Sequence, residues 1–412
     1  GHNWIPWAAA AVAIVVAAAL AFVHLRQKPP EVPTTRFLVL PPEKASSAEY
    51  PTVSPDGRRL AFVATVEGKT QLWVRPLDSL AAQPLSGTDD AMFPFWSADG
   101  RFLGFFAQGK LKKIDLSGGP PQTLCDAAAG RGGAWSPAGG IVFAGGGTGS
   151  LQRVSSAGGV PAPATETDTA DVFHRWPHFL PDGRHFLYYN QRSDREKSGI
   201  FLAALDGKPN SKDHKRVLSG FSMAVYTEIA SGQGHLLFER EGTLMAQPFD
   251  PGKLALGGEP FPAAQQVRSA FVLGGFAAFS ASTAGTLVYQ TGSGAKAQLA
   301  WFDRAGKSLG TIASAEDWDI VSLAPDDKRV ALAQRTVASG DIWLHELARN
   351  TRGRFTFHAA ADNYPVWSPD GSRIAFSSGR GGSVDLYQKA ASGVSEEQLL
   401  LKSNESKFAA DW

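Results

Sequence analysis

Short runs in which apolar and polar residues alternate predict β-strands along most of the chain. In the segment after residues 54–57, Leu60 and Phe62 alternate with smaller residues, and this period of two is that of a strand. The Ser-Pro-Asp-Gly sequence at 54–57 itself predicts a tight turn, because Pro presets φ, Asp bonds to nearby backbone and Gly accepts a positive φ. Almost the same letters return at 363–376. Each copy is therefore predicted to be a hairpin.

The turn recurs roughly every 40–50 residues, which is the length of one four-stranded propeller blade. Further copies lie at 136–139 and 324–327, and weakened ones lie around 231–232 and 283–285. Because repetition in each blade indicates architecture, we interpret the turn aspartates as structural and not as calcium ligands. The residues predicted to form the clear turns are Ser54, Pro55, Asp56, Gly57, Asp99, Gly100, Pro181, Asp182, Gly183, Ser368, Pro369, Asp370 and Gly371.

An aromatic residue recurs immediately before the turn or where the next turn is due, at Trp96, Trp135, Trp367 and Trp412. Large aromatic side chains bury much apolar surface. We expect these four to fill the space between neighbouring blades.

These repeats predict an all-β fold, a β-propeller of four-stranded antiparallel blades over 49–412. About eight repeats are visible, which fits a six-bladed ring followed by part of a second. Repeats five and six are the longest and most degenerate, so the seam between two rings is expected there. The predicted repeats are 49–91, 92–133, 134–174, 175–223, 224–273, 274–317, 318–361 and 362–405, with a ninth begun at 406–412.

The N-terminal segment predicts a transmembrane helix over 1–26, followed by a Pro-rich spacer and first strand over 27–48. Residues 5–25 contain no Lys, Arg, Asp or Glu and are long enough to cross a bilayer as a helix. A cleaved signal peptide, with 19–21 as its cleavage site, and a buried core helix are the alternatives. Arg26 and Lys28, taken alone, would place the remainder in the cytoplasm.

Composition removes several classes of function. The chain has 40 basic and 39 acidic residues and no basic block, so it lacks the charge pattern of a nucleic-acid binder. The single cysteine, Cys125, forms neither an internal disulfide nor a zinc motif. His174, His178 and His185 are close in sequence, but residues four apart on a strand are about 13 Å apart. His178 and His185 flank the turn and could face each other across the hairpin, yet no third ligand is evident. We predict no metal and no cofactor.

One catalytic motif is matched, at Gly306–Gly310, which reads G-x-S-x-G around Ser308. A nucleophile elbow needs a strand before the serine and a helix after it, whereas this stretch lies between two short strand patterns. We therefore predict no catalytic residue.

The repeats resemble the TolB-type, WD40-like propeller repeats with the SPDG turn. The phrases at 72–124, 174–189 and 363–378 are similar to the propeller ectodomain of bacterial receptor-type serine/threonine protein kinases, in which a cytoplasmic kinase precedes a single span. That resemblance implies a non-catalytic sensor outside the cytoplasm, anchored in the membrane, that binds a protein, peptide or small molecule at a propeller face. The kinase motifs themselves are absent from this sequence. The alternatives are a TolB-like periplasmic interaction propeller without a kinase, and the propeller of a prolyl-oligopeptidase-type hydrolase.

Overall fold

The computed structural model describes most of the chain from residue 35 onward. The described residues are 7, 35–146, 149–210, 214–220, 222–228, 232–270, 274–292, 298–312, 318–334, 340–358, 360–381, 383–403 and 407–412. Within these ranges, no helix has the length and apolar character needed to span a bilayer. The predicted span at 1–26 lies outside the described residues, except for Trp7.

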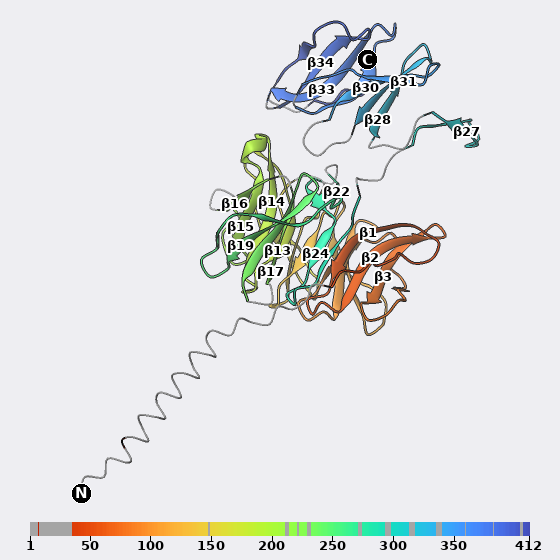
Figure 1. Ribbon diagram of the computed structural model, residues 1–412. Helices are drawn as coiled ribbons and strands as arrows, with labels where there is room; N and C mark the ends of the chain where they lie inside the picture. The colour runs from red at the N-terminus through yellow and green to blue at the C-terminus, as the bar shows by residue number, and fades with distance from the viewer. Residues whose placement is uncertain are drawn as a thin grey trace.

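The first group of strands forms the blades of a ring (Figure 1). Its first three sheets are β1 (Ala45–Val53), β2 (Arg59–Val66), β3 (Lys69–Pro76) and β4 (Gln83–Pro84); β5 (Met92–Trp96), β6 (Phe102–Ala107), β7 (Lys110–Asp115) and β8 (Gln122–Asp126); and β9 (Gly133–Trp135), β10 (Gly140–Phe143), β11 (Gln152–Ser155) and β12 (Ala162–Pro163). The next two are β13 (Asp171–Phe179), β14 (His185–Arg192), β15 (Gly199–Ala204) and β16 (Lys215–Ser219); and β17 (Ala224–Glu228), β18 (Gly234–Arg240), β19 (Thr243–Asp250), β20 (Ala255–Leu256) and β21 (Phe261–Ala264). A short 3-10 helix, η1 (Arg195–Lys197), follows β14.

The sixth blade is irregular. It consists of two hairpins, formed by β22 (Ser269–Ala270) with β23 (Phe276–Ala277) and by β24 (Phe279–Ala281) with β25 (Leu287–Tyr289). Backbone hydrogen bonds join the hairpins, from the Arg268 amide to the Gln290 carbonyl and from the Ala278 amide to the Arg268 carbonyl, both 2.8 Å.

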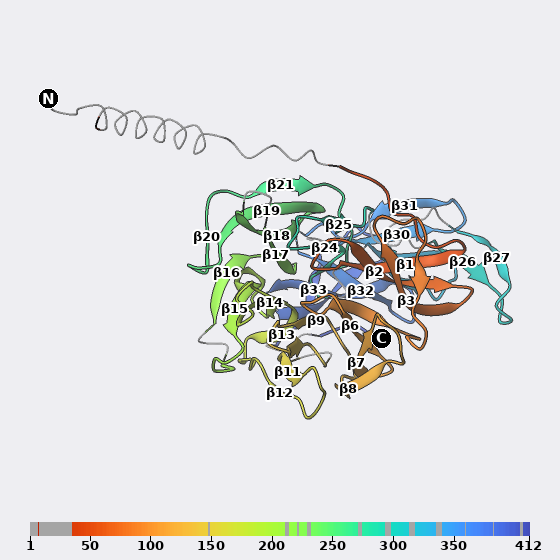
Figure 2. The same cartoon turned by 90° about the horizontal axis from the view of Figure 1, so that it is seen from below.

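The first strands of five blades and β24 of the sixth pack in a closed cycle. β1 contacts β5, β5 contacts β9, and the series continues through β13, β17 and β24 back to β1. At the closure, the Val53 amide donates to Ser280 Oγ (3.1 Å) and Thr283 Oγ1 donates to the Pro55 carbonyl (2.9 Å). Figure 2 shows β9, β13 and β17 nearer the centre than β12, β16 and β20. The prediction of an all-β propeller with four-stranded antiparallel blades is confirmed.

Strands β26–β35 form a second group, drawn at the top of Figure 1. The group contains a hairpin, β26 (Ala300–Phe302) with β27 (Ser308–Thr311), and two four-stranded sheets. These sheets are β28 (Trp318–Leu323), β29 (Arg329–Gln334), β30 (Ile342–Glu346) and β31 (Thr351–Arg354); and β32 (Asp362–Trp367), β33 (Arg373–Gly381), β34 (Ser383–Ala390) and β35 (Gln398–Leu401). The interval 274–317 thus contains β23–β25 of the ring together with β26–β27 of the second group.

The core lies between blades, so a middle strand is buried on both faces. In β2, Leu60 and Phe62 pack into one apolar cluster, whereas Ala61 and Val63 on the opposite face pack into another. Both faces of this strand are apolar because each face must fit a neighbouring blade.

Candidate functional site

The repeated turns are stabilised mainly by their own hydrogen bonds. In the first turn the Gly57 amide donates to the Ser54 carbonyl (2.8 Å), the Arg59 amide donates to Ser54 Oγ (2.9 Å), and Gly57 has φ +71°. Gly100, Gly183 and Gly371 have φ of +66°, +65° and +67°. The turn carboxylates accept local bonds, and the Ser368 hydroxyl and the Ser372 amide lower the pKa of Asp370 to about 2. These carboxylates are occupied in shaping hairpins.

Two of the predicted aromatic residues join blades directly. Trp96 is 7% exposed and donates from Nε1 to the Thr52 carbonyl of the preceding blade (3.0 Å). Trp367 is 5% exposed and donates in the same way to the Ser322 carbonyl (3.0 Å). Trp135 is partly buried and stacks on Phe102 with ring centroids 5.8 Å apart.

Trp412 differs from the other three because its side chain is 47% exposed. No described strand covers it, so it does not fill a space between two blades in this structure. The expectation that all four aromatic residues occupy equivalent buried positions therefore does not hold for Trp412.

Sequence reasoning missed an aromatic plug in the centre of the ring. Tyr50, Phe93 and Trp176 have φ of 55°, 49° and 54°, and each lies at a β-bulge on the first strand of its blade. The Tyr50 and Phe93 ring centroids are 4.4 Å apart, those of Phe93 and Trp176 are 5.2 Å apart, and Phe276 contacts all three rings. At this level the centre of the ring is filled by side chains.

A sequence signal for the plug existed. Each of these residues precedes a proline, at 50–51, 93–94 and 176–177, and the same pair occurs at 364–365. A bulky residue with positive φ is rare, so a repeated aromatic-proline pair marks a fixed backbone distortion. Tyr364, with φ 54°, is the counterpart in the second group, where its ring lies 5.0 Å from that of Phe408.

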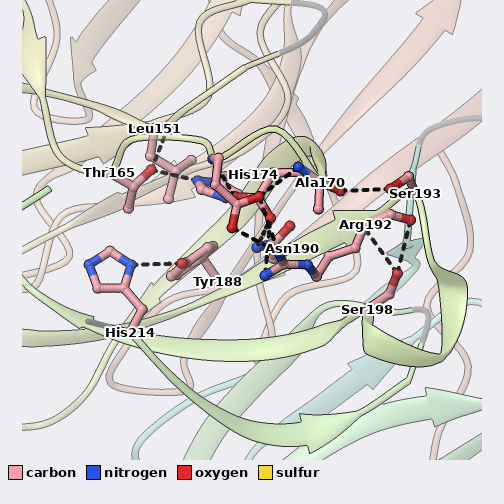
Figure 3. Close-up of polar contacts among 12 residues, drawn as sticks. Leu151, Thr165, Ala170, His174, Tyr188, Asn190, Arg192, Ser193, Ser198 and His214 are labelled. Carbon is pink, nitrogen blue, oxygen red and sulfur yellow. Dashed lines mark hydrogen bonds and ion pairs between the residues drawn. The ribbon is translucent and has the colours of Figure 1, made fainter. Parts of the chain in front are cut away.

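A buried polar network connects the third blade with the fourth (Figure 3). His174 bonds through Nδ1 to Thr165 Oγ1 (2.8 Å) and through Nε2 to Asp171 Oδ2 (3.3 Å). Asn190 Nδ2 donates to Asp171 Oδ1 (2.9 Å), and Arg192 forms an ion pair with the same carboxylate (3.3 Å). Burial opposes ionisation of Asp171, but the hydrogen bonds from His174, the Asp168 amide and Asn190 outweigh it and hold the pKa of Asp171 below its usual range.

Thr165, His174 and Asp171 have the connectivity of a hydroxyl–imidazole–carboxylate triad, yet their surroundings are those of a structural brace. The Thr165 and Asp171 side chains are fully buried and His174 is 1% exposed. Thr165 Oγ1 also accepts the Leu151 amide (2.9 Å), which holds it against a strand of its own blade. A nucleophile needs contact with substrate, and this hydroxyl has no exposed surface.

The same arrangement occurs in the second group. Thr356 Oγ1 accepts the Ile342 amide (3.0 Å), and Arg380 donates to Asp362 (2.9 Å). Counted from the turn glycines, Asp362 and Arg380 correspond to His174 and Arg192. Repetition at two junctions indicates that the network serves architecture.

The remaining histidines do not converge. His178 pairs with Leu187 across the hairpin, and burial lowers its pKa to about 4. His185 instead contacts Asp182 inside its turn. Within the described ranges, no group of three or more His, Cys, Asp or Glu side chains could hold a metal ion.

Ser308 lies at the exposed start of β27, opposite Phe302 of β26. The segment is the second strand of a hairpin, whose turn is closed by the Asp303 amide donating to the Lys307 carbonyl (3.0 Å). This geometry differs from the strand-to-helix turn of a nucleophile elbow.

The second group carries an apolar groove of about 590 Å³ between β28, β32 and residues 408–411. Leu323, immediately before its turn, is 41% exposed, whereas Val53 at the same position in the ring is 4% exposed. Val53 is covered by the closing blade. Among the described residues, no further blade packs against this face of β28 in the way that the closing blade packs against Val53.

Comparisons with known proteins find similarity over part of the chain. No family model matches. Residues of this chain are 32% identical over 84 positions to Tricorn protease homolog 1 of Streptomyces coelicolor, an alignment that covers 18% of this chain and 8% of that protein. The chain thus spans a small fraction of this relative.

Among solved structures, the Cps50 (Swd1) β-propeller domain of Myceliophteria thermophila aligns with 82% of this chain and 95% of its own, at 13% identity and a TM-score of 0.38. An oligogalacturonate lyase of Vibrio parahaemolyticus aligns with 85% of this chain and 92% of its own, at 12% identity and a TM-score of 0.42. Since both scores are low, the fold assignment rests on the strand pairing and the closed cycle of contacts.

Proposed function

We propose that the chain is a non-catalytic binding module, the extracytoplasmic sensor propeller of a single-pass receptor serine/threonine kinase. The observation that carries the binding role is where the polar groups lie. The turn carboxylates and the Thr165–His174–Asp171 network are bonded within or between blades. The loops at the two faces of the rigid ring remain available for binding a partner. Loop residues can vary without disturbing the fold.

The kinase context and the location outside the cytoplasm rest on sequence. They are supported by the resemblance of 72–124, 174–189 and 363–378 to receptor-kinase ectodomains and by the apolar segment 5–25. An alkaline phosphatase fused after Trp412, in bacteria expressing the chain with its native upstream flank, should be active. Activity of only a cytoplasmic reporter at that position would reject the sensor role.

A peptidase propeller is the second candidate, favoured by the partial match to the Tricorn protease homolog. In that case the ring would control the access of peptides to a hydrolase domain, and the ring itself would bind those peptides. Purified chain should show no peptidase or esterase activity under the sensor proposal, and Ser308→Ala should change nothing. Hydrolysis that disappears in Ser308→Ala would favour an enzyme instead. The remaining alternative is a TolB-like propeller without a kinase. The presence of a kinase upstream in the same open reading frame distinguishes the sensor from this alternative.

A further inference from the structure

We propose that one mouth of the six-bladed ring binds an anionic oxygen group, a carboxylate or a phosphate, between the guanidinium groups of Arg131 and Arg175. This inference rests on the proposed binding function and specifies the chemistry of one face.

Topology brings the relevant side chains to the same mouth. Each of the first five blades begins with its innermost strand, and its first three strands pair antiparallel in sequence order, so these inner strands run in the same direction. Residues that precede the aromatic plug on these strands therefore lie toward one face. Glu49 on β1 and Arg175 on β13 directly precede Tyr50 and Trp176, and Arg131 lies just before β9.

The aromatic plug forms the floor of this mouth. The Arg131 guanidinium lies 5.7 Å from the Phe93 ring centroid, and the Trp176 amide approaches the Arg131 carbonyl (3.4 Å). Trp176 Nε1 donates to the Gly274 carbonyl (2.7 Å), and a Cβ on Gly274 would lie 2.3 Å from Arg175 Nη1. These contacts place both arginines around Trp176.

Positive charge is concentrated here. Arg175 is 8% exposed, and its guanidinium lies 3.7 Å over the Phe173 ring. Burial, together with the charge of Arg131, lowers the pKa of Arg175 to about 10. The Glu49 carboxylate forms its ion pair with a third arginine, Arg268, at 3.1 Å. These four side chains therefore have three positive charges and one negative charge.

Arg131 has unused hydrogen-bonding capacity. One terminal nitrogen donates to the Gly130 carbonyl (2.8 Å), whereas the buried Nε has no hydrogen-bond partner in the structure. Buried polar groups are normally paired, and a guanidinium matches the two oxygens of a carboxylate or phosphate. The Arg131 side chain as a whole is only partly buried, so part of it is open to solvent although Nε is not. An anion bound there would reduce the repulsion between the two arginines and satisfy Arg131.

The test is calorimetric titration of the full chain with two probes, inorganic phosphate and benzoate. Saturable binding of at least one probe is expected, and the stronger probe identifies phosphate or carboxylate as the preferred group. Arg131→Gln should weaken that binding at least about tenfold, the usual range for a hydrogen bond to a charged group. Arg131→Lys, which keeps the charge and loses the planar fork, should give an intermediate loss.

Arg58→Gln is the matched control, because it removes the same charge from an exposed turn at the opposite face. It should leave the affinity within about twofold, whereas a simple net-charge effect would make the two Gln variants equal. Equal losses, or no saturable binding of either probe by the folded wild-type chain, would overturn the anion site. Failure of the sensor role appears separately, in the reporter fusion, so the two proposals can be rejected independently.

Discussion

The last residue of each repeated turn has a positive φ, and it is a glycine except at 324–327, where Asp327 has φ 55°. Gly57 and Gly371 have nearly the same backbone, with φ of +71° and +67°, but different surroundings. A Cβ at Gly371 would meet only the ends of the Arg329 and Pro325 side chains, at 3.6 Å and 3.7 Å. At Gly57 it would lie 2.5 Å from Thr286 Oγ1, in the blade that closes the ring.

This pair separates backbone strain from steric overlap. Gly371→Ala should lower the free energy of unfolding by about 1–2 kcal/mol through the positive φ alone. Gly57→Ala should cost more, because Thr286 must also move. Urea unfolding of both variants measures the difference. Equal costs would mean that the Thr286 side chain adjusts freely, and no cost at either site would show that the turn backbone relaxes.

The tryptophans before the turns allow a similar comparison. Trp367 is buried, bonded to the Ser322 carbonyl and covered by the Arg329 guanidinium 4.8 Å away. Trp367→Ala should lower the free energy of unfolding by about 3–5 kcal/mol, as expected for truncation of a large core side chain. Trp412→Ala removes the same atoms from an exposed position and should cost about 0.5 kcal/mol or less. Similar losses would show that Trp412 is buried in solution.

Among the elements, β13 carries the bulge at Trp176, the brace residue His174 and the half-buried His178. The pKa of His178 falls to about 4 in the folded chain, from an ordinary value of 6.5. The unfolded imidazole therefore gains its proton as pH falls below about 6.5, while the folded one gains it only near pH 4. This contribution to stability is complete above pH 6.5 and is lost as pH falls toward 4.

The difference between the folded and unfolded pKa values of His178 predicts that the free energy of unfolding falls by about 3 kcal/mol between pH 7.5 and pH 4. His178→Gln retains a hydrogen-bonding side chain for the Tyr226 backbone but does not titrate. Its free energy of unfolding should fall less steeply with acid than that of the wild-type chain, as measured by urea unfolding at several pH values. Identical slopes would place the origin of the acid sensitivity elsewhere.

The elements also show what the sequence could reveal. The turn spacing predicted four-stranded blades because Pro, Asp and Gly act locally, within four residues. The brace could not be predicted, since Thr165 of the third blade meets His174 only when the third and fourth blades dock. Within the fourth blade, His174 and Asn190 are paired residues of β13 and β14. Burial of Trp96 and Trp367 followed from their position before the turn, but the same position left Trp412 exposed. Packing depends on what covers a residue, which a local pattern does not specify.

At the scale of the whole molecule, the chain consists of two groups of strands that differ in closure. The six-bladed ring is sealed by contacts between β1 and β24 and by the Arg268–Glu49 ion pair. None of the strand pairs that pack extensively joins β1–β25 to β26–β35 within the described ranges. Since an interface of little apolar area couples domains weakly, each group should unfold by itself.

We therefore predict two calorimetric unfolding transitions, each assignable with one tryptophan variant. Trp96→Ala removes a buried contact between the first two blades of the ring and should lower only one transition temperature. Trp367→Ala removes the matching contact of the second group and should lower only the other. The transition that responds to Trp367 should occur at the lower temperature, because Leu323 and its neighbours on β28 remain exposed where Val53 is covered. A single transition shifted equally by both variants would show that the groups are coupled more strongly than their contacts indicate.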